Sequence, residues 1–258
     1  MEWREQDGLR WLEAELPGAR AAFSTRVGGV SEEPYEALNL AIKTGDQPRN
    51  VVENRRRLAA ALGIAPENVV MGRQVHGAEL HRHAAPQEPR VYADAVKSPY
   101  EVDAHATDQA GLVPLVMVAD CLPVALAGPS GVAMAHGGWR GLAGGILETA
   151  AEAVRATAAA IGPGIGPCCY EVGEDVLTEF SGLDGVAEGR MLDLPAVARR
   201  LLQRAGVEQV EASELCTSCN PELLYSHRRD GERTGRQAGL AWLEMRGGST
   251  GEAEEQPD

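Results

Sequence analysis

The sequence lacks any apolar run of the roughly 18 residues that a membrane-spanning helix needs. Its first residues, MEWREQDGLRW, also lack the basic segment followed by an apolar stretch that is typical of a secretory signal peptide. No internal repeat interrupts the chain. We therefore expect a cytoplasmic protein that binds no membrane and whose thiols stay reduced.

Paired cysteines of the kind that staple small secreted proteins are also lacking. The five cysteines are odd in number, and Cys168 and Cys169 are adjacent. The segment from Cys216 to Cys219 is a C-x-x-C motif and so half of a zinc ribbon, but no second C-x-x-C accompanies it. Asn220-Pro221 then favours a turn rather than the helix that normally follows a redox pair. We expect individual thiols here.

An excess of positive charge is absent. The formal net charge is −14, and only four of the negative charges lie in the final stretch GGSTGEAEEQPD. An acidic body argues against non-specific binding to nucleic acid or to anionic membranes. It does not exclude a small anionic substrate, because local arginines can outweigh the net charge. We predict that residues 246–258 form a disordered acidic tail.

Apolar residues make up 44% of the sequence, which is enough for a core. The alternating stretch LRWLEAELPGARAAFSTR predicts a hairpin with its turn at Pro17-Gly18. In GDQPRNVVENRRRLAAALGI, Asp46 or Gln47 can cap a helix that begins at Pro48 and ends near Gly63. Strands and helices interleave along the chain, so the pattern predicts one α/β domain.

The middle of the chain carries the longest apolar stretches. We expect strands over 113–119, 122–127 and 132–136, and Pro123 favours an edge position or a bulge for the second strand. The other expected elements are strand, tight turn at His76-Gly77 and strand over 68–83, a loop over 137–141, a helix over 142–159, a short strand and rigid loop before a helix from about Glu174, a helix over 195–205, and strands or short mixed elements over 207–212, 223–227 and 237–243.

Three candidate metal ligands each follow an apolar strand and precede a turn, a glycine or a proline: His76 in RQVHG, Cys121 in ADCLP and His136 in AHGGWRG. We expect Cys121 and His136 to end neighbouring strands, because strand ends are where α/β sheets present reactive side chains. One thiolate and two imidazoles suit zinc, and a fourth position is left for a water that the metal can activate. The alternative is a core thiol and two surface histidines.

The same residues also fit a cysteine hydrolase. Cys121 would be the nucleophile, His136 its base, and Asp120 or another acid the group that orients the histidine. This interpretation leaves His76 without a role, so we rank it second.

Arginines and one glycine-rich loop are further candidates. Arg140 follows glycines that let the backbone approach a ligand, and its guanidinium could bind phosphate through two hydrogen bonds; a surface salt bridge is the alternative. Arg55 lies unexpectedly on the apolar face of its helix. GPGIGPCCYEVG is a poor dinucleotide-binding fingerprint, because prolines interrupt it, and it more plausibly places Cys168, Cys169 and Tyr170 over a cleft. HRRDG predicts a solvated basic turn.

Taken together, several stretches resemble the laccase-domain family, once labelled multicopper polyphenol oxidases. In chain order they are FSTRVGGVSEEPYEALNL, GDQPRNVVENRRRLAAALG, RQVHG, ADCLPV, AHGGWRGLAGGILE, IGPGIGPCCYEVG, CTSCNPELLYSHRRDG and TGRQAGLAWL. They run from Phe23 to Leu243, so the resemblance covers nearly the whole chain. Members of this family are associated with purine nucleoside phosphorylase and adenosine deaminase activities, and some are named peptidoglycan editing factor.

The resemblance implies a single-domain α/β sandwich of mixed β-sheets flanked by helices, over residues 1–245. It implies one zinc ion held by His76, Cys121 and His136, and purine nucleosides and phosphate as substrates. Asp120, Cys121, His136 and Arg140 are the expected catalytic residues. The expected substrate-binding residues are Asn39, Arg55, Gln74, Arg140 and Cys169. We expect no nucleic-acid partner, and a monomer or a small homo-oligomer.

Two positions depart from the family pattern. Gly137 stands where alanine is usual, which should be harmless. His105 stands where an apolar residue is commoner, so we expect it to add a polar group near the site. Copper fits this sequence poorly, because a multicopper oxidase needs many more histidine ligands than the six histidines here could supply.

Three functional hypotheses follow from the sequence. The first is a zinc enzyme that cleaves adenosine, inosine, guanosine or methylthioadenosine with phosphate and deaminates adenosine to inosine. The second is a cysteine-type amidase that edits peptidoglycan precursors, with Cys121 as nucleophile. The third is a protein that binds a partner without catalysis.

Overall fold

The computed structural model describes residues 1–244, so the predicted tail at 246–258 lies outside the described residues. The strands are β1 (Glu2–Gln6), β2 (Leu9–Leu16), β3 (Ala19–Ser24), β4 (Val69–Val70), β5 (Leu80–His83), β6 (Ala104–Thr107), β7 (Val113–Val118), β8 (Leu122–Gly128), β9 (Gly131–Gly137), β10 (Ala158–Ile161), β11 (Ala187–Glu188), β12 (Met191–Leu192), β13 (Gln209–Ala212) and β14 (Gln237–Leu243). The helices are α1 (Pro48–Ala61), α2 (Trp139–Ala143), α3 (Ile146–Val154), α4 (Glu174–Glu179), α5 (Leu194–Arg204) and α6 (His227–Asp230), with short 3-10 helices η1 (Ile42–Thr44) and η2 (Pro66–Asn68). Within residues 1–244, none of the helices has the length and apolarity to cross a bilayer.

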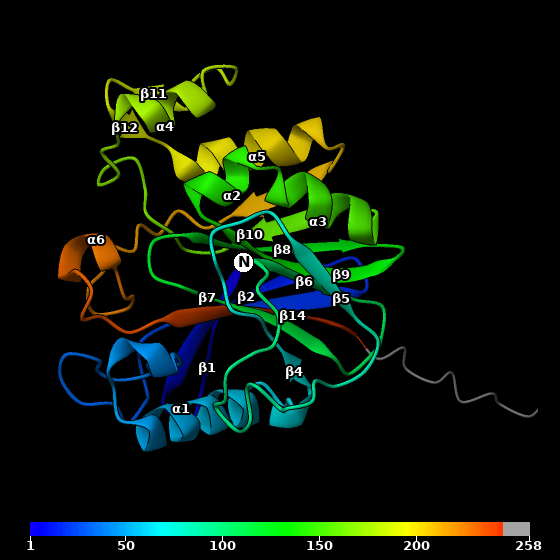
Figure 1. Cartoon of the computed structure of the whole chain (residues 1–258), viewed down its shortest axis with the longest axis vertical. Helices are drawn as coiled ribbons and strands as arrows, with labels where there is room; N and C mark the ends of the chain where they lie inside the picture. Colours follow the sequence, from blue (N-terminus) through cyan, green and yellow to red (C-terminus); the bar gives the residue numbers. More distant parts are fainter. Residues whose placement is uncertain (245–258) are drawn as a thin grey trace, which may run out of the picture.

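Two six-stranded sheets pack face to face (Figure 1). The first has the order β1-β2-β3-β14-β7-β4 and the second β13-β10-β8-β9-β6-β5. Both are mixed, because β4 runs parallel to β7, β5 to β6, and β10 to β13, among otherwise antiparallel pairs. Helix α1 covers the outer face of the first sheet, and α2, α3 and α5 cover the second (Figure 1). The predicted α/β sandwich of mixed sheets flanked by helices is confirmed.

Three buried apolar clusters hold these layers together. One lies between the sheets around Met134, one between the first sheet and α1 around Leu58, and one between the second sheet and α3 and α5 around Ile146. The central strands β8, β9 and β10 thus bury both of their faces, which is why they read as continuous apolar runs. At about 25 cal/mol per Å² of apolar surface, this burial is the main term that favours folding.

Several local predictions are confirmed. The hairpin of β2 and β3 turns at Pro17-Gly18, and α1 begins at Pro48 with Gln47 as its N-cap. The helix predicted over 195–205 is α5, which Asp193 caps by accepting the amide of Ala196. The helix expected from about Glu174 is α4.

Two predictions were wrong: a loop over 137–141 and one long helix over 142–159. Strand β9 continues to Gly137, and α2 begins at Trp139. The helix is interrupted because Gly145 has a φ of 88°, a left-handed conformation that a continuous helix does not accept. Residues 158–161 then form β10, buried between β8 and β13, so tertiary packing overrides the helix preference of its alanines.

Three further predictions need correction. Strands β4 and β5 belong to different sheets, so residues 68–83 cross between the layers instead of forming a hairpin. Pro123 lies in β8 between β9 and β10, not at an edge; it is tolerated near the start of the strand, where its carbonyl accepts the amide of Gly162. Residues 223–227, expected as a strand or a short mixed element, contain no strand: the chain leaves a turn at Leu223 and enters α6 at His227.

Strands β5 and β6 bring three histidines together. His83 Nε2 lies 3.0 Å from His105 Nδ1, and His81 stacks on the Tyr100 ring with centroids 4.0 Å apart. Burial, with the neighbouring His81, lowers the pKa of His83 to about 4, and burial lowers the pKa of His105 to about 3. Both values lie below the usual pKa of about 6.5, so the folded chain keeps these rings neutral.

Stability should therefore fall in acid. Above about pH 6.5 the rings are neutral in both states; below it the unfolded chain binds protons that the folded chain does not, until the folded pKa is reached. Between its unfolded and folded pKa values, each ring should lower the free energy of unfolding by up to about 1.4 kcal/mol per pH unit, over a wider pH range for His105 than for His83. Urea unfolding at several pH values measures this. The double variant His83→Phe, His105→Leu should give a flatter profile, and parallel profiles would contradict the prediction.

Candidate metal and substrate site

His76, Cys121 and His136 converge at one point of the sandwich. Their candidate ligand atoms all lie within 4.8 Å of one another, and the two imidazole centroids are 4.8 Å apart. Zinc bonds of about 2.0–2.3 Å place tetrahedral ligand atoms about 3.3–3.8 Å apart, so this set is compact enough for a single ion. Gly138 lies against it, since a Cβ there would stand 3.1 Å from Cys121 Sγ. The structure thus brings together the three residues predicted as ligands.

The three side chains come from different parts of the fold. His76 occupies a turn after β4 and has a φ of 61°. Cys121 lies in the link that leaves β7 of the first sheet and enters β8 of the second, while His136 lies near the end of β9. We expected Cys121 and His136 to end neighbouring strands, but β7 and β9 belong to different sheets. The strand next to β9 is β8, which Cys121 precedes.

Asp103, which the sequence analysis missed, positions both histidines. Its fully buried carboxylate lies 2.7 Å from His136 Nδ1, and it accepts the backbone N–H groups of Val75, His76 and Gly77 at 2.8–3.0 Å. A carboxylate beside Nδ1 leaves Nε2 for a metal, the arrangement that orients most metal-binding histidines. Its only signal in the sequence was a lone acidic residue at the start of an apolar strand.

Electrostatics favour the ligating form of the cysteine. Burial would raise the pKa of Cys121, but His136 and His76 lower it to about 6, so the thiolate is present at neutral pH. Burial would lower the pKa of His136, but Cys121 and Asp103 raise it to about 9. Burial likewise opposes the charge of Asp103, whose pKa is held below its usual value by His136 and two backbone amides.

Asp120 stands beside the metal-ligand trio with a φ of 92°, where the chain crosses between the sheets. One carboxylate oxygen accepts the Thr217 hydroxyl and the other accepts the backbone N–H of Arg228, both at 2.6 Å. Asp120 therefore does not orient His136; the carboxylate beside that histidine belongs to Asp103. Its carboxylate still faces the cavity, where it can accept a hydrogen bond from a ligand.

A cavity of about 550 Å³ opens beside the trio. Its lining includes two arginines, Arg228 and Arg236, and the aromatic residue Tyr170. Its lining residues are Gln74, His76, Met117, Val118, Ala119, Asp120, Cys121, His136, Ile165, Tyr170, His227, Arg228 and Arg236. The size and the mixture of polar and apolar groups suit a small organic ligand that carries an anion.

Of the predicted substrate-binding residues, only Gln74 lines this cavity, and its amide pairs with both backbone groups of Met117. Asn39 is buried nearby and accepts the backbone N–H of Arg236. Arg55, 2% exposed, donates through Nε and Nη1 to the carbonyls of Leu40, Val91 and Tyr92, and it lines a different cavity.

Three other predicted positions lie outside the cavity lining. Arg140 is exposed on α2 and stacks on the ring of Trp139, although its charge still reaches Tyr170. Cys169 contacts another cysteine instead, Cys219. His105 lies against Gly72 and His83, not at the trio.

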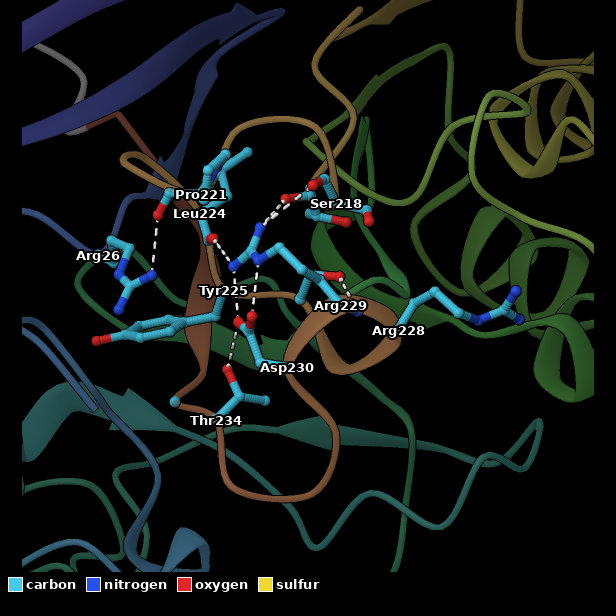
Figure 2. Close-up of polar contacts among 12 residues, drawn as sticks. Arg26, Ser218, Pro221, Leu224, Tyr225, Arg228, Arg229, Asp230 and Thr234 are labelled. Atoms are coloured by element: carbon cyan, nitrogen blue, oxygen red, sulfur yellow. Dashed lines mark hydrogen bonds and ion pairs between the residues drawn. The ribbon is translucent and has the colours of Figure 1, made fainter. Parts of the chain in front are cut away.

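The adjacent arginines of HRRDG have different roles, which the prediction of a solvated turn missed. Arg229 donates to the carbonyls of Thr217 and Leu224 and pairs with Asp230, so it fastens the segment before α6 (Figure 2). Arg228 points away from Arg229 in Figure 2, and its guanidinium lies 5.2 Å from the Tyr170 ring centroid. Consecutive residues of a short helix point to different sides, which is why only one of them reaches the cavity.

The chain is an α/β sandwich of two sheets that carries a candidate His-Cys-His metal site beside a cavity lined by arginines. The family model described as multi-copper polyphenol oxidoreductase laccase matches residues 20–244, and the chain belongs to that family. Of the six histidines, two belong to this cluster, His227 lines the cavity beside it, and the other three lie in β5 and β6.

Relatives with assigned names cover nearly the whole chain. Purine nucleoside phosphorylase YfiH of Escherichia coli is 40% identical over 88% of this chain and 94% of its own length. Purine nucleoside phosphorylase YlmD of Geobacillus stearothermophilus is 37% identical over 94% and 97%. The crystal structure of YlmD from the same organism has a TM-score of 0.84 over 94% of this chain and 98% of its own, at 36% identity.

Asp103→Asn should weaken metal binding. The amide cannot accept hydrogen bonds at both ends, so the His76 turn and the His136 ring lose their common support. Loss of such an outer partner typically costs about 10–100-fold in metal affinity. Chelator competition measures this, with Asp184→Asn, an exposed carboxylate, as the matched control. Equal affinity in both variants would show that Asp103 does not position the ligands.

Proposed function

We propose that this protein is a zinc-dependent enzyme of purine nucleoside metabolism. It cleaves adenosine, inosine, guanosine or methylthioadenosine with phosphate, and it deaminates adenosine to inosine. The observation that carries the proposal is the His-Cys-His trio beside a cavity with two arginines, in a chain whose relatives are named purine nucleoside phosphorylases. The protein acts in the cytoplasm as a monomer or a small homo-oligomer.

Different residues of the cavity bind the phosphate and the nucleoside. Arg228 and Arg236 bind phosphate, because charge-assisted hydrogen bonds from guanidinium groups are the usual solution for this anion in a net acidic protein. Arg140 adds positive charge at the rim, near Tyr170. Tyr170 offers a ring against which a purine can pack, and Asp120 accepts a hydrogen bond from the nucleoside or exchanges a proton with it.

His76, Cys121 and His136 would hold the metal. Two imidazoles and one thiolate favour zinc over the hard cations, and a site with three protein ligands keeps one position open. When bound there, zinc supplies a Lewis acid and lowers the pKa of a coordinated water. Asp103 would keep His136 in the tautomer that presents Nε2.

A second candidate is the cysteine amidase that acts on peptidoglycan precursors. A specific observation favours it: the pKa of Cys121 is lowered to about 6 beside His136, and Asp103 stands behind that histidine. This is the order of nucleophile, base and orienting acid that a cysteine hydrolase needs. His76 has no place in this order beyond helping to lower the pKa of Cys121, so the zinc enzyme remains our first proposal.

Removing one ligand should separate these two functions. Wild-type protein should carry one more zinc ion per chain than Cys121→Ala or His76→Gln, and both variants should lose nucleoside turnover. His81→Gln, outside the trio, should retain both. Zinc content by elemental analysis and product release from adenosine, inosine, guanosine and methylthioadenosine, with and without phosphate, measure this. Full amidase activity in zinc-free protein, lost on alkylation of Cys121, would support the second candidate instead.

Arginine variants should separate phosphorolysis from deamination. Hydrogen bonds to charged groups contribute roughly 1.5–3 kcal/mol each, so Arg228→Met should lower phosphorolysis of inosine by about one to two orders of magnitude. Deamination of adenosine needs water instead of phosphate and should fall less. Arg140→Met should show the same pattern with a smaller loss, because Arg140 is exposed. An equal fall of both reactions would show that these arginines position the nucleoside or support the fold.

A further inference from the structure

Four cysteines meet at a second point of the molecule. Cys168 and Cys169 lie in the loop between β10 and α4, and Cys216 and Cys219 lie in the loop between β13 and α6. All four Sγ atoms lie within 4.8 Å of one another. Cys219 Sγ is 3.5 Å from Cys168 Sγ and 3.4 Å from Cys169 Sγ. The cysteines are free thiols, as expected, but these four lie together in one cluster.

We propose that these four cysteines bind a second zinc ion, separate from the His-Cys-His trio. Zinc–sulfur bonds of about 2.3 Å place the corners of a tetrahedron about 3.8 Å apart, close to the sulfur separations found here. Four thiolates are soft ligands that favour zinc over hard cations and close the coordination sphere, as in structural sites. A disulfide, in contrast, would use only two of the four converging sulfurs.

The backbone around the cluster is shaped for such a site. The carbonyl of Cys216 accepts the amide of Cys219 and the Asn220 side chain, which closes the C-x-x-C turn. The carbonyl of Gly166 accepts the amides of Cys169 and Tyr170, and this turn lets adjacent cysteines reach one point.

Gly166 also contacts the cluster directly. Its N–H donates to Cys216 Sγ at 3.3 Å, a bond that stabilises a thiolate. A Cβ at this glycine would lie 3.5 Å from Cys168 Sγ, so the backbone packs closely against the sulfurs.

The second site would join the two loops that wall the substrate cavity. Tyr170 directly follows Cys169 and lines the cavity. Thr217 lies within the C-x-x-C turn and donates to the Asp120 carboxylate. An ion held by both loops would fix Tyr170 and Asp120 relative to each other without touching the substrate.

Metal content in a background without the first site tests the proposal. Cys121→Ala protein should retain one zinc ion per chain, and wild-type protein should hold two. Adding Cys216→Ser and Cys219→Ser to Cys121→Ala should remove the last ion. Cobalt-substituted Cys121→Ala should absorb strongly through thiolate-to-cobalt charge transfer, as expected for four thiolates. These readouts need no enzyme activity, so they stand whether or not the proposed nucleoside chemistry is correct.

The opposite results are equally distinct. Cys121→Ala protein that is loaded with zinc, desalted and found metal-free would overturn the proposal. Free reaction of all four thiols with a thiol reagent in the folded, zinc-loaded protein would also overturn it. The same holds if the mass of the intact protein shows the loss of two hydrogen atoms that accompanies each disulfide. If the triple variant does not fold, the Cys121→Ala measurement alone decides, and Cys219→Ser, at an exposed position, provides the second variant.

Discussion

The site depends on one buried carboxylate, that of Asp103. It accepts three consecutive backbone amides of the His76 turn and stands beside His136 Nδ1, so a single side chain sets the relative position of two ligands that are sixty residues apart. A buried charge is costly unless it is fully hydrogen-bonded. Here the cost is offset by four donors, and the backbone carbonyl of Asp103 also accepts the amide of His136. Asp103 thus joins the segment that crosses between the sheets at His76 to strand β9 at His136.

Asp120 has a corresponding role in the link between β7 and β8. Its positive φ turns the chain from the first sheet to the second, which presents Cys121 to the histidines. Its carboxylate fixes Thr217 and the start of α6, from which Arg228 enters the cavity. The two aspartates therefore position different components: Asp103 the metal ligands and Asp120 the arginine-bearing wall.

Apolar periodicity and strand-end placement are local signals, and they predicted one α/β domain, the helix at Pro48 and His76, Cys121 and His136 as candidate ligands. The two-sheet sandwich was implied only by the resemblance to a known family. The sequence did not predict that Arg55 donates to backbone carbonyls or that Arg228 reaches the cavity, because both depend on contacts between distant segments. The helix predicted over 142–159 was wrong at its end for the same reason. The alanines of β10 pair with β8 in the second sheet, and this pairing, not their composition, decides their structure.

The four-cysteine cluster shows how the fold joins two loops that local patterns treat as unrelated. Strands β10 and β13 are parallel neighbours in the second sheet. Gly164 pairs with Cys216 in an isolated bridge, which aligns the loop after β10 with the loop after β13. Once β10 and β13 pair, the two cysteine-bearing loops must leave the same edge of the sheet together. The parts of the cavity lining that follow these loops are then tied at their base, and the Arg228 guanidinium lies 5.2 Å from the Tyr170 ring centroid. Cys121 lies directly before β8 and His136 near the end of β9, and the four-cysteine cluster lies in the loops after β10 and β13. Both clusters thus lie where chain segments enter or leave the second sheet, and Cys121 and Tyr170 join them to the lining of the same cavity.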